Sequence, residues 1–562
     1  MNRRALLVAG FCLLLVGVAG VPGVVAEANA ASLGETSPQA GGVAAATGVL
    51  ADAHVESCAA SPLPDYEDPD GKTSDVVGWV EGYWYDEPLD IGAQVDADEL
   101  DVLTKRTAAR VEALRCQSFE ELPDIQMVTP DEYRADIESE VESEYGDAHR
   151  AFENARLATQ LLVGQDQDAV EAIVENQASF PIAFYDVRAD YIGFLTETPD
   201  AIDVNEATLA HELVHALQDQ HFDVESVFEE RTNDGYISSL AVVEGEARLV
   251  ERQYRDNCGV SRIPGQSGGP RDWSEACLLT PPGQVDPPNW GLTLNSLAAY
   301  NAPLVAQRYE SGGWDAVDSL HSSMPQSMVE ALDPDRYGEF EREGISVPDR
   351  SGEEWTRLTL SGNGTETLSA DILGQHGLTA MLMAPYFEAN FPNIWQPGDP
   401  DTEIIPLGEF ANPTTGRLSG YANSVTENWQ DDRFYAYENS AGETAGVWEL
   451  AFREDATAFA NAYVQLLEVR GGNQTANATN VYTFDGVDGF DMAVGIQRLD
   501  ERVRIVMAPS VDDLTAVHAA FEPTSGSDES TPIEDEYGSG FGVAVGLVGL
   551  LTISLLVRAR RR

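Results

Sequence analysis

The stretch TLAHELVHALQDQHF, residues 208–222, contains the pattern His-Glu-Leu-Val-His. On an α-helix, His211 and His215 lie about 40° apart and about 6 Å along the axis, so both imidazoles face the same side. Two nitrogens at this spacing can bind one zinc ion at about 2.0–2.1 Å each. Glu212 lies beside that face, where it can hold a water molecule as a general base. The pattern therefore predicts one Zn²⁺ per chain, with His211 and His215 as ligands.

A third protein ligand is expected, because a catalytic zinc site holds three protein groups and keeps one position for water. Glu244 lies in YISSLAVVEGEARLVERQY, residues 236–254, which predicts a second helix. Its neighbours on the helix face are apolar or small, and a carboxylate there is costly unless a cation pairs with it. Gly245 would let the two helices approach closely. Glu246 is the near rival, because its face is also apolar.

His221 is the other alternative ligand, six residues after His215. The frame H-E-x-x-H-x-x-x-x-x-H has the histidine spacing of the metzincin metallopeptidases. Those enzymes need glycine at position 218 to reverse the chain, whereas this sequence has Gln218. In a continuous helix six residues correspond to about 600°, which turns His221 away from the metal. The sequence therefore favours Glu244, with Glu246 and His221 as alternatives.

The pattern H-E-x-x-H followed by E-G-x-A on the next helix resembles the gluzincin metallopeptidases. The resemblance covers roughly residues 180–255 and implies His211, His215 and Glu244 as zinc ligands. It implies a role for Glu212 as the general base. AHELVHALQDQHF and WQDDRFYAY are also similar to a widespread group of secreted bacterial and archaeal proteins of this kind.

The same resemblance implies that a strand within residues 181–195, PIAFYDVRADYIGFL, lies at the edge of the substrate cleft and binds an extended peptide. The transition state also needs a group that stabilises the oxyanion. Gluzincins commonly use a downstream tyrosine or histidine, and Tyr236 and His376 are the two candidates carried forward. The wider set, among which the sequence does not choose, is Tyr236, Tyr254, His376, Tyr386 and Arg433. Asp219 is a candidate for orienting an imidazole.

The chain has 562 residues and a formal net charge of −62, from 33 basic and 95 acidic residues. The acidic residues are scattered along the whole chain, which predicts a uniformly acidic surface. Such a surface favours solubility and is best tolerated where salt screens it. The pattern resembles that of salt-adapted haloarchaeal proteins. It argues against nucleic acid as a partner, because binding to phosphates needs a basic face.

Both ends of the chain predict targeting. Residues 1–30 combine a charged start, an apolar run and a small-x-small site, which indicates a secretory signal peptide. Residues 541–557 are uncharged and mostly apolar, and four arginines follow, which indicates a membrane-spanning helix. This tail resembles haloarchaeal sorting signals that are exchanged for a lipid anchor, with Ser539 in place of their proline. We therefore expect an exported, membrane-anchored protein whose main domain is extracellular.

Export would allow disulfides and glycosylation. The expected disulfides are Cys58–Cys116 and Cys258–Cys277. The sequons begin at Asn363, Asn473 and Asn477.

The periodicity predicts an α+β protein that is mainly helical near the histidines. The resemblance implies that a zincin-like metallopeptidase domain precedes an α/β-mixed C-terminal region. Helices are expected at 98–117, 131–177, 295–330 and 366–384. The expected divisions are a signal peptide (1–30), a linker (31–75), a helical N-terminal region (76–180), a zincin-like catalytic core (181–345), a C-terminal α+β region (346–522), a polar stalk (523–540) and an anchor with a basic tail (541–562). The expected function is zinc-dependent hydrolysis of peptide bonds at the cell surface. The alternative is a non-catalytic zinc-binding surface protein with the same fold.

Overall fold

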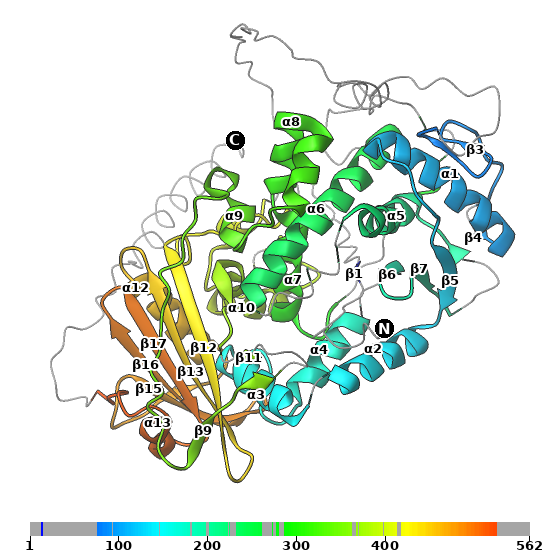
Figure 1. Cartoon of the computed structure of the whole chain (residues 1–562). Coiled ribbons are helices and arrows are strands. Elements are labelled where there is room, and N and C mark those ends of the chain that lie inside the picture. Colours follow the sequence, from blue (N-terminus) through cyan, green and yellow to red (C-terminus); the bar gives the residue numbers. More distant parts are fainter. Residues whose placement is uncertain are drawn as a thin grey trace, which may run out of the picture.

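The computed structural model describes Leu13–Leu14 and residues 76–524. The internal gaps in that range are 93, 145, 180–182, 198–201, 223, 225–226, 228–231, 261–272, 274–276, 280–285, 362–366, 369, 397 and 413–416. The architecture is mixed helix and strand, as the α+β prediction states. Figure 1 shows helices gathered around the long helix α6 on one side of the molecule and a large antiparallel sheet on the opposite side.

The helical part is built on α6, which contacts α5, α7, α8 and α1. Asn205 starts α5, because its side chain accepts hydrogen bonds from the backbone N–H groups of Ala207 and Thr208. The larger helices are α1 (Ala97–Arg115), α2 (Pro130–Glu144), α3 (Asp147–Thr159), α4 (Ala169–Ala178), α5 (Glu206–His221), α6 (Asn233–Asn257), α7 (Trp290–Asn301), α8 (Leu304–His321), α10 (Gly374–Asn390) and α12 (Thr457–Val469). The short ones are α9 (Met328–Leu332), α11 (Leu407–Phe410), α13 (Val511–Val517) and two 3-10 turns, Pro334–Arg336 and Pro400–Thr402.

A small sheet lies beside α5 and is ordered β1-β6-β7-β5. Its strands are β1 (Leu13–Leu14), β5 (Asp124–Val128), β6 (Ala183–Asp186) and β7 (Tyr191–Leu195). The β6–β7 pair is an antiparallel hairpin, so the stretch 181–195 holds two strands rather than one. β5 runs parallel to β7, and β1 pairs antiparallel with the outer edge of β6, where Leu13 lies opposite Tyr185.

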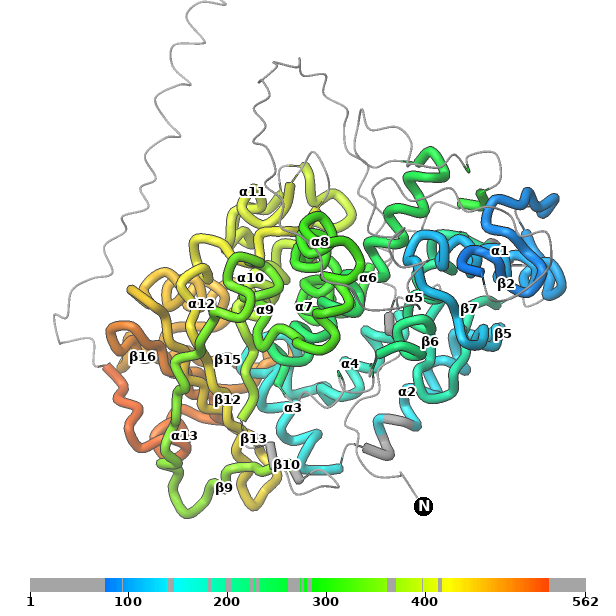
Figure 2. The backbone as a smooth tube through the Cα atoms, turned by 45° about the horizontal axis from the view of Figure 1, so that its top comes forward, coloured from blue at the N-terminus to red at the C-terminus, as the bar shows by residue number. Residues whose placement is uncertain are grey.

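The large sheet holds seven strands in the order β14-β15-β16-β17-β13-β12-β9. They are β9 (Trp355–Arg357), β12 (Trp429–Asn439), β13 (Thr444–Phe452), β14 (Asn473–Gln474), β15 (Val481–Val487), β16 (Phe490–Leu499) and β17 (Arg502–Ala508). Further two-stranded pairs are β2 (Trp79–Val80) with β3 (Tyr83–Trp84), β4 (Gln94–Val95) with β8 (Ile202–Asp203), and β10 (Leu360–Ser361) with β11 (Thr367–Leu368). α3 packs on β12 and β13, which joins the sheet to the helical part (Figure 2).

The WQDDRFYAY stretch has a structural role in this fold. The carboxylate of Asp432 accepts hydrogen bonds from the backbone N–H groups of Leu373 and Gly374, where α10 begins. It also accepts one from the indole of Trp448 on the neighbouring strand, at 2.9 Å. Asp431 accepts from the backbone N–H of Ile345 at 3.0 Å. The two aspartates therefore tie β12 to α10 and to the loop before β9.

The predicted membrane anchor is corrected by the structure. Within the described ranges, no helix combines the length and apolar composition that crossing a bilayer requires. Residues 541–557 and 539, which carry the anchor and sorting-signal predictions, lie outside those ranges. Residues 1–30 do as well, except for Leu13–Leu14, which form β1. This finding contradicts the predicted anchor and the cell-surface localisation that depended on it.

The structure joins Cys258 to Cys277, the expected pair, with their Cα atoms 5.9 Å apart. Cys116 is also disulfide-bonded, while Cys58 lies outside the described residues. Of the three sequon asparagines, Asn473 and Asn477 are exposed and Asn363 lies outside the described residues. Their exposure by itself does not indicate glycosylation, since the expectation depended on export.

Candidate metal centre

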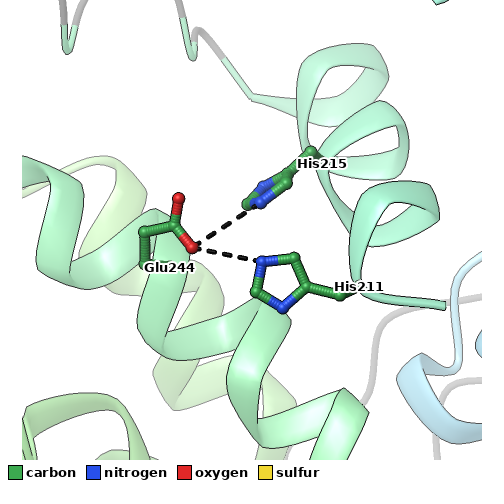
Figure 3. Close-up of side chains that lie close together, drawn as sticks. All are labelled: His211, His215 and Glu244. Carbon is green, nitrogen blue, oxygen red and sulfur yellow. Dashed lines mark hydrogen bonds and ion pairs between the residues drawn. The ribbon is translucent and has the colours of Figure 1, made fainter. Parts of the chain in front are cut away.

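The three residues favoured as zinc ligands come together between α5 and α6 (Figure 3). Nε2 of His211 lies 3.2 Å from Oε2 of Glu244, and Nε2 of His215 lies 3.7 Å from the same oxygen. One ligand atom from each residue falls within 4.8 Å of the other two. The two imidazoles come from successive turns of one helix, and the carboxylate comes from the helix packed against it.

All three side chains are fully buried, as is Glu212. Among the described residues, Nε2 of His215 and Oε1 of Glu244 have no hydrogen-bond partner, and the carboxylate of Glu212 has no side-chain partner and interacts with the backbone N–H of Tyr185. Buried polar atoms without partners are costly, and a cation would satisfy those of His215 and Glu244. Two imidazole nitrogens and a carboxylate also form a donor set typical of zinc. The residues therefore fit a zinc ion.

Gln218 orients the imidazole of His215, and Glu251 lies near the imidazole of His211. Nδ1 of His215 lies 2.9 Å from Oε1 of Gln218, and Nε2 of Gln218 donates to the backbone carbonyl of Val243 at 3.0 Å. Because that amide oxygen can only accept, it holds the proton on Nδ1 and leaves the Nε2 lone pair directed at Glu244. Nδ1 of His211 lies 3.7 Å from Oε2 of Glu251, about two turns beyond Glu244 on α6. Neither neighbour was predicted from the sequence, although Gln218 lies three residues after His215.

The electrostatics of the centre follow from burial next to a carboxylate. Burial disfavours protonation of His211, but hydrogen bonds to Glu244 and Glu251 outweigh it and raise its pKa to about 9. Burial lowers the pKa of His215 to about 4. Burial also raises the pKa of Glu212 to about 8, against the opposing charge of His211. The buried carboxylates thus draw a positive charge to this point.

The two alternative ligands lie in other environments. Glu246 accepts from Nε of Arg115 at 2.5 Å and lies 2.7 Å from Nε2 of His321, so its charge is already balanced. These partners lower the pKa of Glu246 against the effect of burial. Nε2 of His221 lies 2.9 Å from the backbone carbonyl of Ser118, at the end of α5. Neither residue joins the group around Glu244.

Most of the oxyanion candidates are engaged elsewhere. His376 lies on α10, where Nε2 is 3.2 Å from Nδ2 of Asn233 and Nδ1 is 3.5 Å from Asp234. The other engaged residues are Tyr254, which donates to Glu206, Tyr386, which donates to the carbonyl of Ile394, and Arg433, which contacts Asp431.

Of the candidates, Tyr236 lies near the centre, and a further tyrosine, Tyr300, lies there as well. Burial raises the pKa of Tyr300 well above its usual value, and the charges of Glu244 and Glu212 raise it further, with a smaller contribution from Tyr236. Tyr300 therefore extends from α7 into the electrostatic environment of the centre. The sequence analysis missed Tyr300, because no local pattern connects α7 with α5.

The structure places two further residues singled out from the sequence. Asp219 accepts a hydrogen bond at Oδ2 from the hydroxyl of Tyr185 at 3.0 Å, which ties α5 to β6. Gly245 permits a close approach, but the neighbour is α8 rather than α5. A Cβ atom on Gly245 would meet Cγ2 of Val305 at 2.8 Å.

Comparison with known families covers part of the C-terminal half. Residues 363–518 match a family described as a domain of unknown function, DUF8575. No curated protein and no solved structure matches the chain. The matched region contains the WQDDRFYAY stretch and α10, while His211, Glu212, His215 and Glu244 lie outside it.

Proposed function

We propose that this protein is a zinc-dependent metallopeptidase with a zincin-like, gluzincin-type centre. One observation carries the proposal: the ligand atoms of His211, His215 and Glu244 converge, and the carboxylate of Glu212 lies beside them with no side-chain hydrogen-bond partner among the described residues. A structural zinc site needs four protein ligands. Three ligands with a carboxylate alongside that no other side chain binds favour hydrolysis.

His211, His215 and Glu244 would hold the zinc ion, with Gln218 orienting His215. When bound, zinc supplies a Lewis acid that polarises the scissile carbonyl and lowers the pKa of water toward 7. Glu212 takes a proton from the attacking water and delivers it to the leaving amine nitrogen. Its buried position and raised pKa suit a group that must both accept and return a proton.

The outer edge of β6 supports a peptide as the substrate. Leu13 and Leu14 pair there in antiparallel register, opposite Tyr185 and Phe184, so this edge accepts an extended segment. The same strand lies against α5, which carries Glu212. An extended peptide on this edge would bring its backbone beside the general base.

The test is the Glu212→Gln variant, compared with wild type and with Glu310→Gln, an exposed carboxylate on α8. Zinc content is measured by elemental analysis, and hydrolysis with a library of quenched fluorescent peptides. We expect one zinc per chain in all three proteins and hydrolysis in all but Glu212→Gln. Full activity of Glu212→Gln would refute the role of this residue.

The second candidate is a zinc-binding protein without catalysis. It is favoured by the complete burial of His211, Glu212, His215 and Glu244. In that case zinc is retained, no peptide is cleaved, and the ion exchanges slowly with a chelator because water cannot reach it. Rapid exchange together with cleavage would exclude this alternative.

A further inference from the structure

Arginines gather on α6 just beyond the metal centre. Arg248 and Arg252 follow Glu244 by four and eight residues, so the three lie along one side of the helix. Nη1 of Arg248 donates to Glu251 at 2.6 Å, and Glu251 faces His211. The two arginines therefore lie one and two turns beyond Glu244 on the same side of α6.

Arg417 joins this group from another part of the chain. Its Nη2 lies 3.5 Å from the backbone carbonyl of Asn301, at the end of α7 and next to Tyr300. Desolvation of the guanidinium lowers the pKa of Arg417, and the like charges of Arg252 and Arg248 lower it further. Arg417 thus lies at the end of α7, which packs against α6, and the like charges of Arg252 and Arg248 act on it.

The arginines on this part of α6 share one carboxylate partner. Glu251 is shared, because it accepts from Arg248 and also from Nε of Arg255 at 2.9 Å. Arg252 is exposed and makes no ion pair with any described residue. The chain has 95 acidic and only 33 basic residues, so an excess of arginine is unusual on this protein. It sets this side of the centre apart from the acidic remainder, which would repel an anion.

We propose that Arg248, Arg252 and Arg417 bind a carboxylate of the substrate, so that the centre prefers peptides with a negative charge near the scissile bond. This inference rests on the proposed peptidase function and adds its substrate class. Guanidinium groups suit the role because their planar donors bind carboxylates in pairs and stay charged at every relevant pH. The carboxylate is either the free C-terminus of a peptide or an acidic side chain.

Binding is measured on the zinc-loaded Glu212→Gln background, where bound peptide stays intact. Three labelled peptides that are otherwise identical are compared by fluorescence anisotropy. The first has a free C-terminus and no acidic side chain, the second has an amidated C-terminus and one glutamate, and the third has an amidated C-terminus and no acidic side chain. Arg252→Gln and Arg417→Gln are compared with Arg498→Gln, which removes an exposed arginine from β16 in the distant sheet. Each measurement is made at two salt concentrations at which the protein is folded.

We expect at least one anionic peptide to bind about 10-fold more tightly than the neutral one, since a hydrogen bond to a charged group contributes about that factor. Arg252→Gln and Arg417→Gln should each reduce that preference about 3- to 10-fold, added salt should weaken it, and Arg498→Gln should leave it unchanged. Preference for the free C-terminus or for the glutamate identifies which carboxylate is bound.

Equal binding of all three peptides, no binding of any, or an equal loss in Arg498→Gln would overturn the inference. Cleavage by wild type is measured with the same peptides. Cleavage without a charge preference leaves the proposed function standing and removes the inference. A charge preference without any cleavage removes the peptidase function and leaves a carboxylate-binding site beside the metal centre.

Discussion

Glu244 and Glu246 are two residues apart, and replacing each with glutamine should have opposite effects. In Glu246→Gln, Arg115 loses the carboxylate at 2.5 Å while its side chain is only 1% exposed. Removing one partner of a buried ion pair costs about 3–5 kcal/mol. Asp318 remains beside Arg115, which favours the lower end, about 3 kcal/mol. Zinc binding should be unchanged.

In Glu244→Gln the metal-free protein should lose less stability than Glu246→Gln does, because His211 loses its carboxylate partner at 3.2 Å but can give up its proton, whereas Arg115 cannot. A further loss appears with zinc. Removing a direct ligand should weaken zinc binding by more than the roughly 10–100-fold seen for outer-shell partners. At zinc 100-fold above the wild-type Kd, wild type gains about 2.7 kcal/mol and the variant about 0.4 kcal/mol or less.

The assay is unfolding by denaturant, followed by tryptophan fluorescence, with chelator and with buffered zinc. Zinc content is measured on the same samples. Wild type and Glu310→Gln serve as references. Loss of zinc in Glu246→Gln, or zinc-dependent stabilisation of Glu244→Gln equal to wild type, would refute the assignment of Glu244 as the third ligand.

The remaining predictions concern neighbouring contacts. Gln218→Leu should weaken zinc binding about 10- to 100-fold by freeing the His215 imidazole; a chelator titration checks this, and an unchanged Kd contradicts it. Gly245→Ala should cost about 1–2 kcal/mol in unfolding free energy, since overpacking against Val305 exceeds the gain in helix propensity; a more stable variant contradicts it. Burial lowers the pKa of His518 to about 4, so its neutral form supports the fold above pH 6.5, and this support is lost as pH falls toward 4. His518→Gln should therefore remove about 2–3 kcal/mol of acid destabilisation over that range, and unfolding curves of equal pH dependence in both proteins would contradict this.

Much of the local structure follows from periodicity. The helix expected at 98–117 corresponds to α1. The segment expected to be helical at 131–177 is divided into α2, α3 and α4, because only short breaks interrupt it. The expected helix at 295–330 is divided into α7, α8 and α9. The helix expected from 366 begins only at Gly374, where Asp432 from the distant β12 accepts its first backbone N–H groups. That boundary depends on a contact 58 residues away in the chain.

The membrane prediction shows a different limit. It rested on residues 541–557, whose composition suits a bilayer, and hydropathy alone cannot relate such a segment to the folded chain. The helices that the structure describes do not supply a span.

The sequence by itself determined the pairing of His211 with His215, because residues four apart on a helix always share a face. It also favoured a glutamate on the next helix as the third ligand of the proposed zinc site, with His221 as an alternative. Only the tertiary structure separated Glu244 from Glu246, since both lie on buried faces and the difference is what each face meets. Glu244 meets the imidazoles of α5, whereas Glu246 meets Arg115 of α1 and His321 of α8. A helix fixes which way its side chains point, and packing alone decides which partner stands there.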